Sequence, residues 1–168
     1  METLVGGNHL RRLGFDDLAG VQTHLLSLDM VSRNRRFHCG FSDAAVTAYA
    51  SRFDPINDIL FGAIEPVSNR VVGLAEARAG CAPRTVDLGV SVLEPQRRRG
   101  IGHQLSARVV EFAFATGSDA VELVFDPENL AAQRIAVGLG ARFHAPGRAV
   151  VHAPASLETP AGDPQASP

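Results

Sequence analysis

The sequence predicts an α/β (α+β) fold built around one central sheet, and three observations carry that prediction. Two apolar runs, 57–67 and 70–79, meet at Pro-Val-Ser-Asn turn residues, a pattern typical of a β-hairpin. Residues 85–93 alternate strictly between apolar side chains and small or polar ones, as a half-buried strand does. Beyond them, segments with helical spacing alternate with further strand-like segments, which favours helices packed on a sheet.

The remaining elements follow in chain order. An amphipathic helix is expected after Asp16 and Asp17, and a second one from about residue 42 to 53. The polar, arginine-rich segment 26–41 between them is expected to be a connection. Further on, a helix of about four turns is expected from 101 to near Gly117, and a strand at 120–127. Asn129 begins a helix that stops near Gly140, and a last strand is expected at 148–153. The coarse order is β-α-α-β-β-β-α-β-α-β.

Length and composition indicate one soluble domain. The 168 residues suit a single core, with 45% hydrophobic and 20% charged residues. We expect the domain to span residues 1–153 and the proline-rich segment 154–168 to be disordered. The start of the chain lacks a signal-peptide pattern, and no stretch is apolar enough to span a bilayer. Two distant cysteines, Cys39 and Cys81, favour a reduced, cytoplasmic protein with no metal site of cysteines.

The formal net charge of −2 argues against a general nucleic-acid or polyanion binder. No aromatic residues are interspersed among the arginines, as nucleic-acid recognition would favour. All 16 basic residues are arginine, so the chain offers no lysine amine. Any attraction for phosphate must therefore be local, and arginine suits forked contacts to phosphate.

One such local site is expected at residues 97–102, which read Arg-Arg-Arg-Gly-Ile-Gly between the alternating strand and a helix. A glycine-rich turn at the start of a helix presents free backbone N–H groups to an anion. A Walker A loop is excluded because it requires lysine, and a dinucleotide fingerprint is excluded because position 105 is leucine. Without the flanking elements, a solvated charge cluster would be the simpler interpretation.

This stretch matches the [QR]-x-x-G-x-[GA] signature of the GCN5-related N-acetyltransferase (GNAT) superfamily, which the chain resembles over roughly residues 8–153. Asn129, the Leu139-Gly140 pair and Phe143 resemble the family's next block. The segment from 26 onward is similar to the acetyltransferase domains of bacterial protein lysine acetyltransferases. The resemblance implies a mixed, mostly antiparallel sheet of about six to seven strands with about four helices. Two central strands are then splayed to form an acetyl-CoA cleft.

The resemblance also implies where acetyl-CoA binds. Backbone groups of Val90 and Val92 would contact the pantetheine arm, and an N–H there could hold the oxyanion of the thioester. The pyrophosphate would lie on the loop and first helical turn, at Arg97, Arg98, Arg99, Gly100, Ile101, Gly102 and His103. Asn129 would contact the pantetheine, cap its helix, or do both.

The same resemblance implies the transfer of an acetyl group to a primary amine. Such an amine has a pKa of about 10.4 and must lose a proton. Asp87 is the candidate base, because protein-acetylating relatives carry a glutamate there, and Glu76 on the preceding strand is the second candidate. An ion pair with an arginine is the structural alternative for Asp87. Many relatives have a tyrosine as general acid where this chain has Ala136, and the only tyrosine is Tyr49.

Two functions remain open on the sequence. The leading hypothesis is an N-acetyltransferase acting on a protein lysine or a small-molecule amine. The other is a catalytically degenerate domain that binds CoA as a sensor or scaffold, which Ala136 and the short acid at position 87 would allow. No metal or membrane partner is expected, and the protein is expected to be a monomer or a homodimer.

Overall fold

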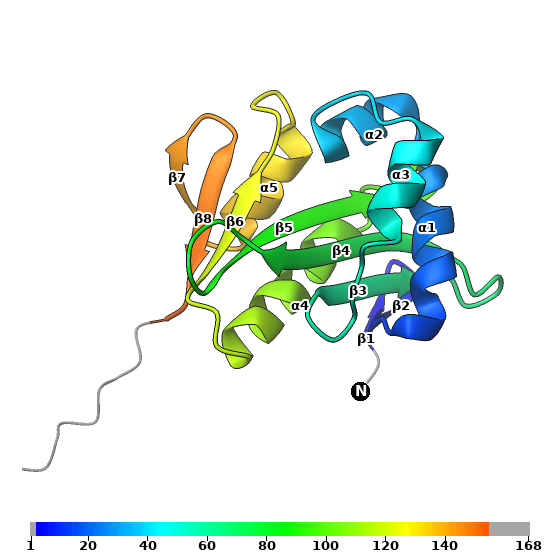
Figure 1. Ribbon diagram of the computed structural model, residues 1–168, viewed down its shortest axis with the longest axis horizontal. Helices are drawn as coiled ribbons and strands as arrows, with labels where there is room; N and C mark the ends of the chain where they lie inside the picture. The colour runs from blue at the N-terminus through cyan, green and yellow to red at the C-terminus, as the bar shows by residue number, and fades with distance from the viewer. Residues whose placement is uncertain (1–2, 155–168) are drawn as a thin grey trace, which may run out of the picture.

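One mixed sheet of eight strands organises residues 3–154, the part of the chain that the computed structural model describes. The strand order is β1-β2-β3-β4-β5-β6-β8-β7, and every neighbouring pair is antiparallel except β5 and β6. Figure 1 shows the sheet crossing the molecule between two groups of helices. The strands are β1 (Thr3–Val5), β2 (Asn8–Arg12), β3 (Ile59–Ile64), β4 (Val71–Ala79), β5 (Thr85–Val92), β6 (Ala120–Val124), β7 (Arg142–Ala145) and β8 (Arg148–His152).

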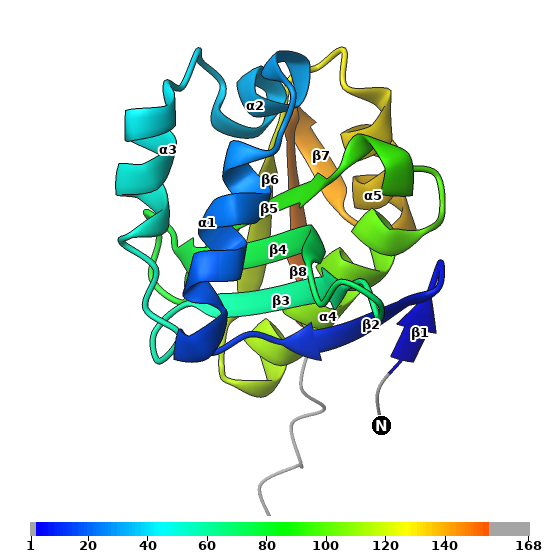
Figure 2. The same cartoon turned by 90° about the vertical axis from the view of Figure 1, so that its right-hand side faces the viewer.

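Five α-helices cover the two faces of this sheet (Figure 2). The first three lie on one face and the last two on the other, so the domain has three layers. Two short 3-10 turns, Phe15–Asp17 and Glu94–Gln96, join neighbouring elements. The helices are α1 (Leu18–Leu26), α2 (Met30–Phe37), α3 (Asp43–Ala50), α4 (Ile101–Ala115) and α5 (Leu130–Gly138).

Two apolar cores hold the layers together. The core under α4 contains Leu105 and Val109, which lie on one side of the helix and are fully buried against the sheet. The core under α1 and α3 contains Leu25 and Val46, also fully buried. Alternate residues of β3 enter different cores, Ala63 the first and Leu60 the second. β5 contributes apolar residues such as Leu88 to the first core alone, as its strict alternation predicted.

The central elements confirm the sequence predictions. β3 and β4 form the expected hairpin, with Asn69 in the left-handed conformation (φ 52°) that its turn requires. β5, α4, β6, α5 and β8 all occur where the patterns placed them. The mixed, mostly antiparallel sheet with two diverging central strands is confirmed as well.

The element count was predicted too low, because there are eight strands and five α-helices in the described range. The segment expected to be a connection contains α2, none of whose residues is fully buried, although Phe37 packs against the core under α1 and α3. The polar, arginine-rich composition of this segment is the reason that the helix was not predicted. β7 is exposed along its whole length and shows no alternation. The β1–β2 hairpin turns at Gly6 and Gly7, both with positive φ, and these two glycines were the signal that was overlooked.

The divergence of β5 and β6 positions the candidate site. β4 and β5 are paired along nearly their whole length, from Gly73↔Val92 to Ala79↔Val86. β5 and β6 are paired only from Thr85↔Ala120 to Leu88↔Leu123. Beyond Leu88, the edge of β5 that faces β6 has no strand partner. The Val92 carbonyl there accepts from Arg97, and the other backbone groups on that side have no ladder partner and can bind a ligand.

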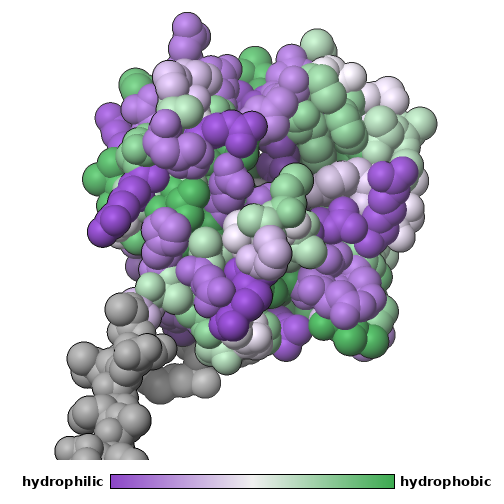
Figure 3. All heavy atoms as spheres, turned by 60° about the vertical axis from the view of Figure 1, so that its left-hand side comes forward, coloured by the Kyte–Doolittle hydropathy of each residue, from purple (hydrophilic) through white to green (hydrophobic). Residues whose placement is uncertain are grey.

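The surface away from this gap is chemically mixed. Figure 3 shows the side that carries β7 and β8, where hydrophilic and hydrophobic side chains are interspersed. Within the described residues, no helix is long and apolar enough to cross a membrane. The predicted proline-rich tail, apart from residue 154, lies outside the described residues.

Candidate functional site: the cleft between β5 and β6

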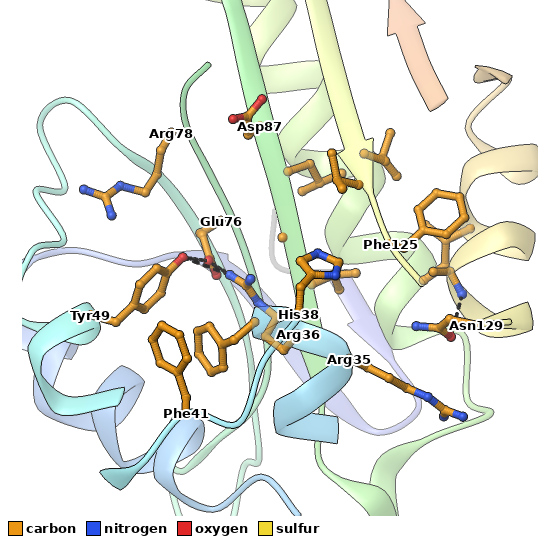
Figure 4. Close-up of a pocket in the computed structure, with 18 of the residues that line it drawn as sticks. Arg35, Arg36, His38, Phe41, Tyr49, Glu76, Arg78, Asp87, Phe125 and Asn129 are labelled. Carbon is orange, nitrogen blue, oxygen red and sulfur yellow. Dashed lines mark hydrogen bonds and ion pairs between the residues drawn. The ribbon is translucent and has the colours of Figure 1, made fainter. Parts of the chain in front are cut away.

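A cleft of about 630 Å³ opens where β5 and β6 diverge. Its walls come from elements that are far apart in the sequence, namely α2, α3, β4, β5, β6 and α5. The lining is partly aromatic and partly charged (Figure 4). The lining residues used below are Arg35, Arg36, Phe37, Tyr49, Glu76, Asp87, Gly89, Val90 and Asn129.

The glycine-rich loop lies at the end of β5 and begins α4. Arg98 and Gly100 both have positive φ (60° and 79°), and Gly100 is the N-cap of the helix without a side-chain cap. Three further backbone N–H groups, those of Ile101, Gly102 and His103, belong to the first turn and therefore have no acceptor within the helix. The helix dipole adds partial positive charge at the same place, which gives this turn the geometry of an anion site.

Gly102 brings α4 close to the cleft walls. A Cβ atom on Gly102 would lie 3.2 Å from Ile135 Cδ1, and 3.6 and 3.9 Å from the Cγ2 atoms of Val92 and Val90. The first turn of α4 therefore packs directly on the β5 residues predicted to contact pantetheine. The anion site and the gap between the strands are thus adjacent parts of one surface.

The three arginines of the loop are not equivalent. The Arg97 guanidinium donates to the Val92 carbonyl (3.0 Å) and forms an ion pair with Asp29 (2.9 Å), the N-cap of α2. Arg99 donates to the Gln96 side chain (3.1 Å). All three arginines are exposed, so their side chains can reach a phosphate only from the solvent side of the loop.

Two other predicted cofactor residues have structural contacts of their own. Asn129 caps α5, because its Oδ1 accepts a hydrogen bond from the Ala132 N–H (3.3 Å), and it also lines the cleft. The His103 ring packs against α5, where a Cβ on Gly138 would lie 2.7 Å from Nε2. The His103 side chain is therefore directed at the neighbouring helix, and only its backbone faces the loop.

Glu76 is the centre of a buried polar cluster on the side of the cleft that α2 and α3 cover. Tyr49 of α3 donates a hydrogen bond to Glu76 Oε1 (2.6 Å), and Arg36 of α2 forms an ion pair with the same oxygen. Arg36 also donates to the Tyr49 hydroxyl (3.1 Å), which closes the triangle seen in Figure 4. The Glu76 side chain is 2% exposed and that of Arg36 12%. These three residues come from three elements that only the fold brings together.

Asp87 lies on the same face of the sheet but farther along β5 (Figure 4). It is opposite Arg78 on β4 and Glu122 on β6. Partial burial raises its pKa above the usual value, the nearby Glu122 carboxylate raises it further, and Arg148 opposes this rise. Much of the residue remains open to solvent, so Asp87 can exchange a proton with water.

The buried side chain of His24 on α1 contacts β5. The ring nitrogens of His24 contact the Val71 carbonyl through Nδ1 (3.0 Å) and the Ser91 hydroxyl through Nε2 (2.9 Å). A carbonyl only accepts, so Nδ1 carries the proton and Nε2 accepts from Ser91. Burial lowers the pKa of His24 to about 4, so the ring is neutral at physiological pH. This contact ties α1 to the strand that forms one edge of the cleft.

No group of three or more histidine, cysteine, aspartate or glutamate side chains in the described residues is arranged to hold a metal ion. Cys39 and Cys81 are both free and exposed.

The family of this chain follows from a comparison of its sequence with known families. The sequence model of the Acetyltransferase (GNAT) family matches residues 30–140, well over half of the chain. The protein belongs to the GNAT family. The match includes α2, the glycine-rich loop and α5, and it confirms the resemblance found on the sequence. Curated protein sequences give no match.

Solved structures of GNAT proteins share the fold of this family member at low sequence identity. The GNAT domain of S. lividans PAT superposes with a TM-score of 0.73 at 13% identity, covering 91% of this chain and 96% of that domain. A ribosomal-protein-S5-alanine acetyltransferase from Vibrio fischeri gives 0.68 at 9%, covering 90% and 96%. A cAMP-binding acyltransferase from Mycobacterium smegmatis gives 0.62 at 20%, covering 91% of this chain but 47% of its own.

Within this GNAT domain, the contacts that the sequence did not predict are those of α2. For Arg36, together with Arg33 and Arg35, the sequence left two interpretations open, a solvated loop or the acceptor-binding segment of relatives, and the pairing of Arg36 with Glu76 was not foreseen. Asp29 and Ser32 carry the signal that could have found α2, because the Asp29 side chain accepts from the Ser32 N–H (2.9 Å) as an N-cap. The sequence holds no local signal for the Arg36–Glu76 contact, since the two residues are 40 positions apart.

Proposed function

We propose that this protein is an acyl-CoA-dependent N-acetyltransferase that moves the acetyl group of acetyl-CoA to a primary amine. The observation that carries the proposal is the loss of β5–β6 pairing beyond Leu88, directly beside the glycine-started first turn of α4. One surface thus offers free strand backbone for the pantetheine arm and free helix N–H groups for the pyrophosphate. GNAT membership supports acyl transfer in general, and acetyl-CoA is the donor we propose.

The donor would bind mainly through backbone. The N–H groups of Gly100, Ile101, Gly102 and His103 surround the pyrophosphate, and Arg98 and Arg99 add charge from the solvent side. Arg97 contributes its backbone, because its side chain is held by Asp29. The free edge of β5 at Val90 and Val92 binds the pantetheine amides, and Asn129 closes the other side of the arm.

The chemical step is attack of a neutral amine on the thioester carbonyl. A β5 N–H beyond Leu88 polarises that carbonyl and stabilises the oxyanion, a contribution of roughly 3 kcal/mol in comparable sites. The nitrogen–carbon bond forms and the carbon–sulfur bond breaks, and CoA leaves as its thiolate.

Asp87 is the proposed proton acceptor. Its raised pKa makes it a stronger base than an ordinary aspartate once it is ionised, and its open side passes the proton on to water. Glu76 is the alternative base, but in this structure Tyr49 and Arg36 both engage one of its oxygens. Its buried position suits the binding of the acceptor's ammonium group better than repeated proton exchange.

The leaving thiolate needs no dedicated acid in this mechanism. Position 136, where many relatives carry tyrosine, is a fully buried alanine. A thiol with a pKa of about 8.5 leaves readily as a thiolate and takes a proton from solvent. Tyr49, the only tyrosine, donates its hydroxyl hydrogen to Glu76 instead.

The test is release of free CoA thiol from acetyl-CoA in the presence of a panel of primary amines, including lysine peptides. We expect amine-dependent thiol release, and an Asp87→Asn variant should lose about 10²- to 10⁴-fold in kcat while still binding CoA. A Glu76→Gln variant should chiefly raise the KM for the amine. An unchanged rate in Asp87→Asn would remove Asp87 from the mechanism and leave the enzyme in place.

A second function is a CoA-binding sensor or scaffold without catalysis. The buried Ala136 and the closed Arg36–Glu76 pair are the observations that favour it. The same assay separates the two functions, because a sensor would bind CoA stoichiometrically and release no thiol with any amine.

A further inference from the structure

The Arg36 guanidinium lies where the acceptor amine would have to arrive. Gly89 is the first residue of β5 beyond its last pair with β6, and its cross-strand neighbour on β4 is Glu76. A Cβ atom on Gly89 would overlap the Arg36 guanidinium, so this cation rests directly on the β5 backbone at that point. The thioester carbonyl is proposed to bind at the same divergence.

The surroundings of the guanidinium are those of a cation-binding site. The Glu76 carboxylate and the Tyr49 hydroxyl contact it directly. The rings of Phe37 and Tyr49 lie 5.2 and 5.6 Å from its Cζ atom, within the range of a cation–π interaction. Carboxylate, hydroxyl and ring faces together would suit an ammonium group as well as they suit a guanidinium.

The cluster also has unused binding capacity. Neither the second oxygen of Glu76 nor Nε of Arg36 has a hydrogen-bond partner in the described part of the chain, although both atoms are buried. A fully buried carboxylate oxygen normally accepts at least one hydrogen bond. An ammonium group has three donors, so it could satisfy both Glu76 oxygens at once.

We propose that Arg36 is a built-in substrate mimic: in the free protein it occupies the acceptor subsite formed by Glu76, Tyr49 and Gly89, which accepts a primary amine carried on a long alkyl stem. Resting on the proposed function, this inference narrows the acceptor to lysine-like amines. Four side-chain atoms separate Cα from the guanidinium carbon of arginine, as four separate Cα from the amine nitrogen of lysine, so the two cations reach nearly the same place. The guanidinium, however, stays protonated and is no nucleophile. The Arg36 side chain is therefore never acetylated, and the chain contains no lysine that could be acetylated in its place.

The deciding experiment converts the mimic into a substrate. An Arg36→Lys variant incubated with acetyl-CoA should acquire one acetyl group at position 36, found by peptide mass mapping. The ammonium group at position 36 loses one proton to Asp87, and the resulting neutral amine attacks the thioester carbonyl. The carbon–sulfur bond breaks, and the nitrogen releases its second proton as the amide forms. One proton then joins the CoA thiolate to give the free thiol. The rate should be independent of protein concentration, because donor and acceptor are held in one molecule.

The matched control is Arg35→Lys. Arg35 is the preceding residue of α2 and also lines the cleft, but it is more exposed and lies away from Glu76 (Figure 4). Simple chemical acetylation would favour this more accessible amine. We expect it to be modified at least about tenfold more slowly than the amine at position 36, because only position 36 is aligned with the cleft.

Free acceptors give a second measurement. Nα-acetyl-lysine amide should be a better acceptor than the short-stemmed Nα-acetyl-2,3-diaminopropionamide for the wild-type protein. An Arg36→Gln variant, which empties the subsite of its cation, should lower the KM for the lysine compound several-fold. A purely structural ion pair would leave that KM unchanged or raise it.

The outcomes separate this inference from the function on which it rests. Thiol release by the wild-type protein, with no acetylation of Arg36→Lys or equal acetylation of Arg35→Lys, overturns the substrate mimic and leaves the acetyltransferase standing. No thiol release by wild type or by either variant overturns both. Thermal melts of the variants confirm folding, which Arg36→Lys should preserve because it keeps the positive charge beside Glu76.

Discussion

The two sides of the cleft are built in different ways. The proposed donor side consists of backbone groups from a short continuous stretch, the end of β5 and the start of α4. The proposed acceptor side consists of the side chains Arg36, Tyr49 and Glu76 from three separate elements. A site made of backbone tolerates many side chains and leaves a short sequence signature. A site made of distant side chains leaves none, but it can be retuned by single substitutions.

The largest effect is expected from a substitution in the Arg36–Glu76 pair of the proposed acceptor side. A Glu76→Ala variant leaves the Arg36 cation buried without its counterion, and we expect the free energy of unfolding to fall by about 3 kcal/mol. Denaturant unfolding would measure the change. An Arg36→Ala/Glu76→Ala double variant should recover part of the loss, because it removes the unpaired charge. If the single and double variants were equally destabilised, the pair would not be the cause.

A change of similar size in the free energy of unfolding is expected when the pH is lowered, because His24, which contacts Ser91 of β5, becomes protonated. The pKa of His24 is about 4 in the folded protein and about 6.5 in the unfolded chain, so the unfolded state binds more protons between these two pH values. His24 stabilises the fold fully above pH 6.5, and this stabilisation is lost as the pH falls toward 4. The loss reaches about 3 kcal/mol at the lower limit. Unfolding titrations at several pH values would show this slope.

The control for that slope is a His24→Gln variant, which cannot titrate in this range. Its free energy of unfolding should be lower at neutral pH but nearly flat between pH 6.5 and 4, apart from the carboxylates. An equally steep slope in the variant would assign the pH dependence to other groups.

A smaller effect tests the donor side. Gly100 has φ of 79°, a conformation that costs a residue with a side chain roughly 1–2 kcal/mol. Gly100→Ala should therefore distort the first turn of α4 and weaken CoA binding about tenfold, measured by calorimetry. Gly117→Ala is the matched control, because Gly117 has a similarly positive φ (98°) just beyond the other end of α4. The control should lose stability and keep its CoA affinity.

The smallest effect concerns the link between the two sides. Asp29 caps α2 and pairs with Arg97 of the donor loop, and hydrogen bonds from Ser32, with Arg97 adding to them, hold its pKa well below the usual range. Asn is an equally good N-cap, so Asp29→Asn removes the ion pair and keeps the cap. Because the pair is solvent-exposed, we expect a stability loss below about 1 kcal/mol. A larger change in CoA affinity than in stability would show that the link couples donor and acceptor sites.

The sequence alone determined the parts of this protein that depend on local patterns. Strict alternation predicted β5, turn residues predicted the β3–β4 hairpin, and glycines between a strand and a helix predicted the glycine-started first turn of α4 and the family. Asn129 was predicted as a cap from its position before an apolar helix, and its side chain does cap α5. Each signal lies within a few residues because the interaction behind it is local.

Only the tertiary structure decided what lies opposite the donor loop. The arginine-rich composition of α2 did not indicate a helix. Its position rests on Phe37, which packs against the core under α1 and α3, and on arginine contacts to residues far away in the chain. In the sequence, Glu76 is one acidic residue on a predicted strand. In the structure it is a buried carboxylate that contacts Arg36 and Tyr49. The sequence specifies which backbone groups are free, since that follows from local conformation. Which side chains meet across the cleft depends on how three helices pack on the sheet.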